Sequence, residues 1–294
     1  MGFQRFRLSH EDVFVAARGL PAERVGRGLL PGAGRGPDMS SEACAGLVER
    51  GDPDRFMATM AAPVAVRQLF WPLYAFNLEL ARAPWVTQEP LIAEMRLQWW
   101  RDVVSEIGAG GVVRVHEVAS PLARVVRGKS LPVALLDGMA EARRWDIYRA
   151  PFADEAAFSA HLDATAGHLM WLCALALGAE VAAEAAVRDV AWALGLANWL
   201  RAVPELEARG RLPLVDGRQA AVKALAAEGL ARLARARRRG VSRALAPALL
   251  PAWQAGGLLA QVVRAPGRVA DGTLGLAEFR KRGGLAVRAV FGGW

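Results

Sequence analysis

The spacing of apolar residues is the feature that most restricts the fold of this chain. From Asp52 to the C-terminus, apolar side chains recur three and four positions apart, as α-helices require, and no segment alternates as a half-buried strand would. An Ala- and Leu-rich composition also favours helix. We therefore expect an all-α fold, orthogonal or bundle-like. After a first short helix at Asp52, the predicted helices cover 63–83, 87–107, 119–127, 132–148, 154–178, 182–202, 216–238, 242–264 and 275–290.

Capping residues and prolines set several of these boundaries. Asp52 precedes Pro53 and is predicted to cap a helix, because its carboxylate can accept a first-turn N–H. Thr87, shortly before Pro90, is predicted to cap another. Pro72 lies inside a predicted helix and is expected to kink it.

Residues 1–38 differ from the rest of the chain. They form a Gly-, Pro- and Arg-rich N-terminal extension, which we interpret as flexible and separate from a helical domain over 39–294. The stretch Gly32-Ala33-Gly34-Arg35-Gly36 superficially resembles a phosphate loop, but it follows no strand and opens no helix. A further hypothesis is that Met39 is the true start of the protein.

The chain carries a net charge of +8, almost entirely from arginine. This charge favours anionic partners such as diphosphates or acidic lipids, although a solvated surface explains it equally simply. We expect no nucleic-acid partner, because no recognised binding module is present. Cys44 and Cys173 fit no metal or disulfide pattern, which suggests a reducing cytoplasm. The longest apolar run, 169–178, is too short to span a bilayer.

Two basic segments are candidates for peripheral membrane contact. Arg232, Arg235, Arg239 and Arg243 recur every three to four residues and are predicted to form one basic helix face, either against anionic lipid or in water. The segment from Arg280 to Trp294 combines charge with aromatic residues. The predicted location is therefore cytoplasmic, with contact at the inner face of the cytoplasmic membrane as one option.

Several segments, taken in order, resemble the squalene/phytoene synthase family. They include the run Tyr-Ala-Phe at 74–76 within residues 63–82, Met-Arg-Leu-Gln-Trp-Trp at 95–100, and Thr-Ala-Gly-His at 165–168. Asn-Trp-Leu-Arg at 198–201 and Gly-Arg-Leu-Pro at 210–213 follow. The resemblance covers about residues 52–215 and extends more weakly to the end of the chain.

The resemblance implies an isoprenoid-synthase-like helical fold around a central cavity. Active members of the family join two prenyl diphosphates head to head and use Mg²⁺ to bind the diphosphate. The metal ligands are two aspartate-rich sequences on facing helices, where acids at i and i+4 share one face. This chain departs from the family at five of those acidic positions: Ala81, Arg82, Trp85, Ala202 and Leu206.

Those departures favour a non-catalytic or catalytically divergent member of the family over an enzyme. Arg82 could hold an anion without a metal, whereas Glu79 is expected to point away from the former acidic face. The runs at 74–81 and 95–100 look like the branch of the family that assists assembly of mitochondrial respiratory complex I. That likeness implies complex I subunits or assembly intermediates as partners, with a prenyl or other lipid as a further ligand. The alternative is an active prenyltransferase. No cofactor is expected, except Mg²⁺ under that alternative.

Eleven residues are candidates for the cavity or its ligand, chosen by their place in the motifs. They are Arg67, Tyr74, Asn77, Glu79, Trp99, Gly167, His168, Asn198, Arg201, Glu205 and Arg211. His161 and His168 are seven residues apart and are predicted to share a helix face as polar lining or hydrogen-bonded core. Gly167 is expected to allow close helix approach. Six tryptophans could line a tunnel or belong to an ordinary core: Trp71, Trp99, Trp100, Trp171, Trp192 and Trp199.

Overall fold

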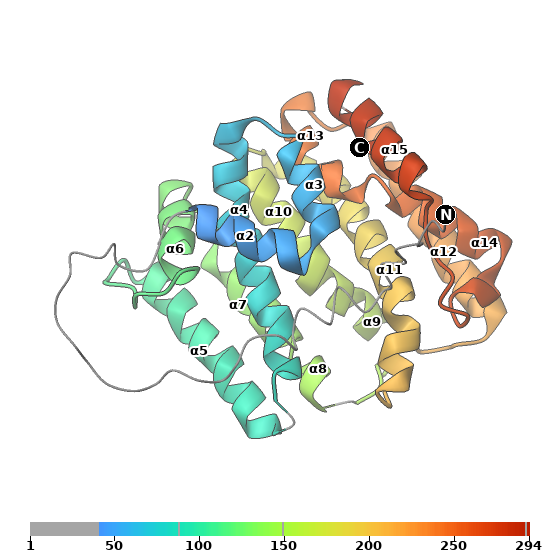
Figure 1. Cartoon of the computed structure of the whole chain (residues 1–294), viewed down its shortest axis with the longest axis horizontal. Helices are drawn as coiled ribbons and strands as arrows, with labels where there is room; N and C mark the ends of the chain where they lie inside the picture. The colour runs from blue at the N-terminus through green and yellow to red at the C-terminus, as the bar shows by residue number, and fades with distance from the viewer. Residues whose placement is uncertain (1–40, 88, 149, 292) are drawn as a thin grey trace, which may run out of the picture.

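The computed structural model describes residues 41–87, 89–148, 150–291 and 293–294, and within these ranges it is helical with no strand. The all-α prediction is therefore confirmed (Figure 1). The predictions about residues 1–38 and Met39 fall outside the described residues. The α-helices are α2 (Ser41–Gly51), α3 (Pro53–Met60), α4 (Val64–Arg82), α5 (Pro90–Gly108), α6 (Ala119–Gly128), α7 (Val133–Ala142), α8 (Trp145–Tyr148), α9 (Glu155–Leu162), α10 (His168–Ala176), α11 (Glu184–Ala208), α12 (Gln219–Arg239), α13 (Ala246–Leu249), α14 (Ala255–Arg264) and α15 (Glu278–Phe291).

Shorter 3₁₀ and π segments join these helices, and they explain where the predicted boundaries were wrong. The predicted helix 154–178 is α9 and α10 joined by a π-helical turn, η2 (Asp163–Gly167). The predicted helix 242–264 is divided into short pieces, because Pro247 and Pro251 lack an N–H and each begins a new turn. The predicted helix 132–148 is two helices, α7 and α8. Helix α2 was not predicted.

The two predicted caps have different outcomes. Asp52 caps α3, because its carboxylate accepts the Arg55 N–H at 2.9 Å. The Thr87 prediction was wrong: α5 begins at Pro90 with Glu89 at the capping position, and the Thr87 hydroxyl accepts the Glu89 N–H at 3.1 Å instead. Helix α4 runs from Val64 to Arg82 with Pro72 inside it.

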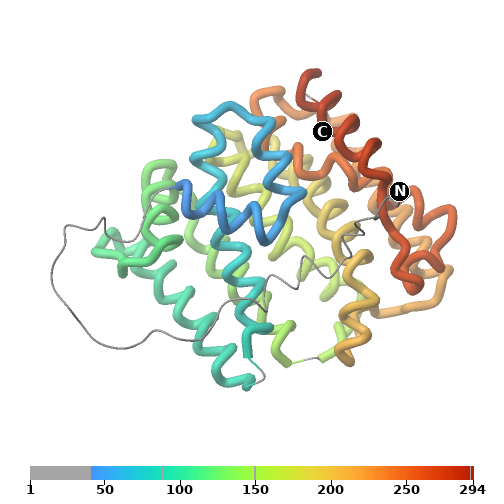
Figure 2. The backbone as a smooth tube through the Cα atoms, viewed as in Figure 1, coloured from blue at the N-terminus to red at the C-terminus, as the bar shows by residue number. Residues whose placement is uncertain are grey.

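Helix α10 lies at the centre of the packing. Seven of its nine residues are buried, and it contacts α4, α7 and α11. Helices α12 and α14 cover α11, while α6 packs on α4 and α5 packs on α7. The tube in Figure 2 shows that α4 and α11 both end at the lower side of the molecule, with the start of α5 and α8 beside them. Among the described helices, none is both long enough and apolar enough to cross a bilayer.

A buried carboxylate joins α11 to α12. Asp189 accepts hydrogen bonds from Arg235 at 2.8 Å and from Arg239 at 3.2 Å, and Arg232 lies 3.8 Å away. Arg232 also stacks on the Trp192 ring at 4.2 Å. The basic face for lipid or water stays a prediction, because Arg243 is exposed and the Arg235 and Arg239 side chains are 37% and 49% exposed. Arg232, Arg235 and Arg239 nevertheless have a partner on α11. The Asp189 carboxylate, which is 7% exposed, turns them toward α11.

We predict that Asp189→Asn lowers the free energy of unfolding by roughly 1–3 kcal/mol, because three guanidinium groups lose the charge that they share. Urea denaturation followed by circular dichroism measures the change. The matched control is Asp216→Asn, which breaks the pair with the exposed Arg218 and should alter stability much less. Equal losses in the two variants would contradict a structural role for the Asp189 cluster.

Candidate functional site

A cavity of about 590 Å³ lies between the C-terminal parts of α4 and α11. Helices α2 and α3 border one side of it, while α8, α9, η2 and α10 supply the rest of its wall. The cavity therefore draws on elements from most of the chain. Its position matches the central cavity that the family resemblance implies.

The five positions where the resemblance places acids all line this cavity. Ala81, Arg82 and Trp85 come from α4 and the 3₁₀ turn η1 (Ala83–Trp85), and Ala202 and Leu206 come from α11. Residues four apart on each helix share a face, so the two sets meet across the same space. The geometry is that of two facing helices, but no carboxylate occupies these positions.

Arginines outnumber carboxylates in the cavity wall. Arg50, Arg55, Arg82 and Arg143 line it, and the only acidic lining residues in the described part of the chain are Glu79 and Asp146. Arg55 also pairs with Asp52, outside the lining, at 2.9 Å, so the four arginines face three carboxylates and an excess of one positive charge remains. The cavity is therefore suited to a ligand with an anionic group.

Each acidic lining residue already faces an arginine. Glu79 lies 3.6 Å from Arg82, and Asp146 lies 3.4 Å from Arg143. Burial raises the pKa of both carboxyl groups, while the neighbouring arginines oppose that change. The prediction that Glu79 points away was wrong, because the cavity also reaches the flank of α4 that carries Glu79, beside Leu78 and Arg82.

Magnesium, which the resemblance implies for an active member, does not fit these residues. The ion prefers several oxygen ligands, usually including carboxylates. Both carboxylates of the lining are paired with arginine, and in the described ranges no three His, Cys, Asp or Glu side chains lie close enough to hold an ion. The donor set of the cavity therefore suits an anion held directly by arginine.

Aromatic rings form the wall beside α9 and α11. Trp145 stacks on Phe152 at 4.7 Å between ring centroids, and Trp199 packs at 5.2 Å from both Trp145 and His161. His161 and Trp199 line the cavity directly. The wall is thus aromatic on this side, in contrast to the ion pairs that Arg82 and Arg143 form with Glu79 and Asp146.

His161 is the most unusual titratable group in the lining. Its Nε2 atom is buried and has no hydrogen-bond partner. Burial, with a smaller contribution from the nearby Arg143 guanidinium, lowers the pKa of His161 to about 3. The imidazole is therefore neutral at physiological pH and can donate to, or accept from, a polar group of a ligand.

The π-helical turn separates His161 from His168. A π-helix turns through a smaller angle per residue than an α-helix, so residues on its two sides lose their common face. His161 faces the cavity, whereas His168 Nδ1 lies 3.1 Å from the Leu135 carbonyl oxygen of α7. The prediction of one shared histidine face was wrong for this reason.

Close contact between helices occurs at Gly195 rather than at Gly167. A Cβ atom at Gly195 would come within 2.9 Å of the Ala166 Cβ on η2, so only glycine allows α11 to lie this near. A Cβ at Gly167 would instead collide with the Asp163 carboxylate, which pairs with Arg188 at 2.8 Å. Gly167 therefore leaves room for an ion pair.

Of the eleven candidate residues, three line the cavity: Asn77, Glu79 and Asn198. The other eight lie outside its lining because they have partners elsewhere. Arg67 donates to the Ala62 carbonyl, Tyr74 pairs with the Cys173 thiol in the core, and Trp99 packs on His116. Arg201 lies 3.5 Å from Asp54, Glu205 pairs with Arg209, and Arg211 donates to the carbonyls of Trp145 and Asp146. The contacts at Gly167 and His168 are described above. Among the six tryptophans only Trp199 lines the cavity, and Trp71, Trp100, Trp171 and Trp192 are buried in the core.

Sequence reasoning missed four charged lining residues: Arg50, Arg55, Arg143 and Asp146. Arg50 and Arg55 lie in α2 and α3, before the first recognisable motif. Arg143 and Asp146 lie at the break between α7 and α8, which was predicted as one continuous helix. A sequence signal for them was absent, since each reaches the cavity only through tertiary packing.

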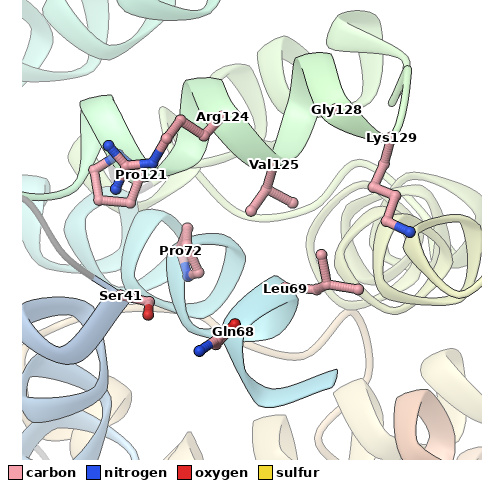
Figure 3. Close-up of a pocket in the computed structure, with 9 residues that line it drawn as sticks. All are labelled: Ser41, Gln68, Leu69, Pro72, Pro121, Arg124, Val125, Gly128 and Lys129. Atoms are coloured by element: carbon pink, nitrogen blue, oxygen red, sulfur yellow. The ribbon is translucent and has the colours of Figure 1, made fainter. Parts of the chain in front are cut away.

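A second pocket, of about 450 Å³, lies on the outside of the molecule between α2, α4 and α6 (Figure 3). Figure 3 shows the side chains of Leu69, Pro72 and Val125 along it, with Lys129 at one end. It shares no residue with the cavity described above and contains none of the candidate residues. It plays no part in the site.

Comparisons with known proteins agree with this geometry. The model of the family described as squalene/phytoene synthase matches residues 48–283. A dehydrosqualene synthase crystal structure superposes with a TM-score of 0.69 at 14% identity, covering 85% of this chain and 95% of that one. Squalene synthase HpnC from Alicyclobacillus acidocaldarius superposes with a TM-score of 0.63 at 17% identity, covering 76% and 93%. At these identities the structures show a common fold.

The curated relatives carry a different name. The protein named NADH dehydrogenase (ubiquinone) complex I, assembly factor 6, is 26% identical in Bos taurus over 64% of this chain and 56% of that protein. The Homo sapiens protein of the same name is 25% identical over 65% and 58%, and a Drosophila melanogaster homolog is 28% identical over 58% and 53%. The chain thus spans a little over half the length of the curated relatives it matches.

We predict that stability falls as the pH is lowered from 6.5 to about 5, because the unfolded chain protonates His161 in this range and the folded chain does not. His161 contributes at most about 1.4 kcal/mol per pH unit to the slope of the unfolding free energy against pH. Urea unfolding of the wild type and His161→Gln across this range measures it, with the less buried His116→Gln as control. A slope that is unchanged in His161→Gln would show that His161 is not held neutral by burial.

Proposed function

This chain belongs to the squalene/phytoene synthase family, and we propose that it is a non-catalytic member that assists the assembly of respiratory complex I. The observation that carries the proposal is the chemistry of the two facing helices. All five positions where the resemblance places metal-binding acids line the cavity, and they hold alanine, arginine, tryptophan and leucine. The family's diphosphate chemistry depends on metal-bound carboxylates, so this substitution supports loss of catalysis.

The arrangement of the remaining acidic residues of the cavity also supports the loss of catalysis. A metal site could survive the loss of some ligands if neighbouring carboxylates moved in. Glu79 and Asp146 are the acids nearest to this role, and each is engaged by an arginine. Replacing a carboxylate with a guanidinium at position 82 also reverses the charge that a metal ion would meet.

Respiratory complex I subunits or assembly intermediates are the proposed partners. The supporting observation is that mammalian and insect relatives are named as complex I assembly factors. We further propose that the protein works in the cytoplasm as a peripheral protein at the inner face of the cytoplasmic membrane. Complex I assembly at a membrane would bring the protein and its partners to the same surface.

A prenyl lipid with an anionic head is the proposed ligand of the cavity. The aromatic wall at Trp199 and His161 suits an apolar chain, while Arg82, Arg55 and Arg143 suit phosphate oxygens. The ligand would be bound and retained, because no paired acids are available to help diphosphate leave. Binding and assembly are separable parts of this proposal.

We predict that deleting the gene lowers both assembled complex I and NADH:quinone activity, and that the full chain restores them. Native gel electrophoresis of membranes and a quinone-reduction assay measure the two quantities. Succinate-driven respiration serves as the control and should be unaffected. Normal levels of both the complex and its activity in the deletion strain would reject the assembly role.

We also predict that the purified protein yields no C30 or C40 hydrocarbon from farnesyl or geranylgeranyl diphosphate with Mg²⁺. Gas chromatography of the extracted products, with an active squalene synthase as positive control, makes this measurement. Hydrocarbon formed at an enzyme-like rate would establish the alternative, an active prenyltransferase.

A third prediction concerns how the ligand is held. Farnesyl diphosphate should bind equally well with Mg²⁺ or EDTA, and Arg82→Gln should weaken binding roughly tenfold, since one charge-assisted contact is lost. Arg82→Lys should lose less, and the exposed Arg264→Gln should bind as the wild type does. Calorimetric titration provides the dissociation constants. Binding that requires Mg²⁺ would contradict an arginine-held ligand.

A further inference from the structure

Helix α15 carries its apolar side chains on the outside of the molecule. Phe279 is 89% exposed, Phe291 75%, Val290 70% and Val287 57%. No residue of this helix is fully buried. A helix on the surface of a globular protein normally shows the opposite arrangement, with its apolar stripe against the core.

Spacing shows that these residues form one stripe. Phe279, Gly283, Ala286, Val287 and Val290 follow one another at intervals of four, three, one and three, which places them on a single face of an α-helix. Phe291 lies at the edge of that face. The stripe contains no charged residue.

The opposite face of α15 holds the helix in this orientation. The Lys281 ammonium pairs with Asp54 of α3, and the Trp253 indole N–H donates to the Lys281 carbonyl at 3.2 Å. Leu285 packs against the small cluster formed by Ala58, Leu250 and Trp253. The orientation is therefore fixed by specific contacts, and rotating the helix to bury the stripe would break them.

Basic side chains flank the exposed stripe. Arg280 and Arg282 extend on either side of it, and the Arg282 side chain is 77% exposed. At the far end of the helix, Arg237 of α12 lies over the Trp294 ring at 5.4 Å, with Arg238 exposed beside it. Glu278 is the one acidic residue within α15, and it lies near Lys281 and Arg282. The surface around the stripe is therefore positively charged.

We propose that α15 is an interfacial helix that lies along an anionic membrane, with Phe279, Val287, Val290 and Phe291 inserted among the lipid chains. An apolar face with basic residues at its borders is the pattern of helices that bind in the plane of a bilayer. The flanking arginines reach the height of the lipid phosphates. The positive charge at the borders of the stripe complements anionic headgroups, which favours a lipid surface over a protein partner.

This inference rests on the peripheral membrane location proposed above, and it assigns the membrane contact to the exposed face of α15. It does not depend on the role in complex I assembly. The site also differs from the sequence-based candidate at Arg232, Arg235 and Arg239, whose guanidinium groups are bound to Asp189. Of the two basic segments, only the C-terminal one combines charge with exposed apolar side chains.

The test is co-sedimentation of the purified full chain with two kinds of vesicle, one of phosphatidylcholine alone and one that also contains phosphatidylglycerol. We expect binding to the anionic vesicles, weaker binding to the neutral ones, and a decrease as salt is raised. The double variant Phe279→Ser/Val290→Ser should bind on the order of tenfold more weakly. Arg280→Gln/Arg282→Gln should reduce binding to anionic vesicles only.

The matched control is Val112→Ser/Val181→Ser, which removes two valines that are 95% and 79% exposed elsewhere on the molecule. It should bind vesicles as the wild type does. All variants alter exposed positions, and circular dichroism melting checks that they fold. Wild-type protein that stays in the supernatant with anionic vesicles, or a Phe279→Ser/Val290→Ser variant that sediments as the wild type does, would overturn the proposal.

Two further outcomes are informative. If the apolar face instead joins two copies of the chain, light scattering will show a dimer that Phe279→Ser/Val290→Ser dissociates, and vesicle binding will be absent, which overturns a lipid role. Vesicle binding without any complex I defect in the deletion strain would support the membrane surface and reject the assembly role. The two proposals can therefore fail separately.

Discussion

The close approach of α11 to the π-helical turn at Gly195 is the contact on which the cavity depends. A side chain there would push α11 away from Ala166. Because α11 lies this close, the residues one to three turns further along it, from Asn198 to Leu206, face α4 across the cavity. The π-turn itself directs His161 into the same space while His168 turns to α7. One small residue and one irregular turn thus set the position of the whole wall.

The cavity combines the fold shared with the synthases with side chains other than the acids that the resemblance implies. Helices α4 and α11 still face each other as the synthase fold requires, and superposition on two synthases extends over most of the chain. The side chains between them are now arginine, alanine and aromatic rings. Such a cavity attracts an anion directly, because each guanidinium supplies several donors and a permanent charge. A bound ligand could then stabilise the fold without being transformed.

Fold class and most helices could be predicted from the sequence, because periodicity and proline placement are local properties. The five altered positions could also be found, because neighbouring motif residues mark them. The lining residues Arg50, Arg55, Arg143 and Asp146 could not, since tertiary packing alone brings them together. Arg201 and Arg211 were plausible candidates by motif, but a carboxylate and two backbone carbonyls hold them elsewhere. Motifs identify helix faces better than they identify the partners of long side chains.

The arginines show why net charge alone says little about function. Those on α12 that converge on Asp189 are structural, because three guanidinium groups share one buried carboxylate. Arg82 and Arg143 line a partly sheltered cavity, where each lies beside a carboxylate, Glu79 or Asp146. Arg280 and Arg282 border an apolar ridge in water, where charge acts over a longer range and is weakened by salt. The same residue type therefore has a structural role on α12 and different proposed roles in the cavity and on α15, and the local surroundings account for the difference.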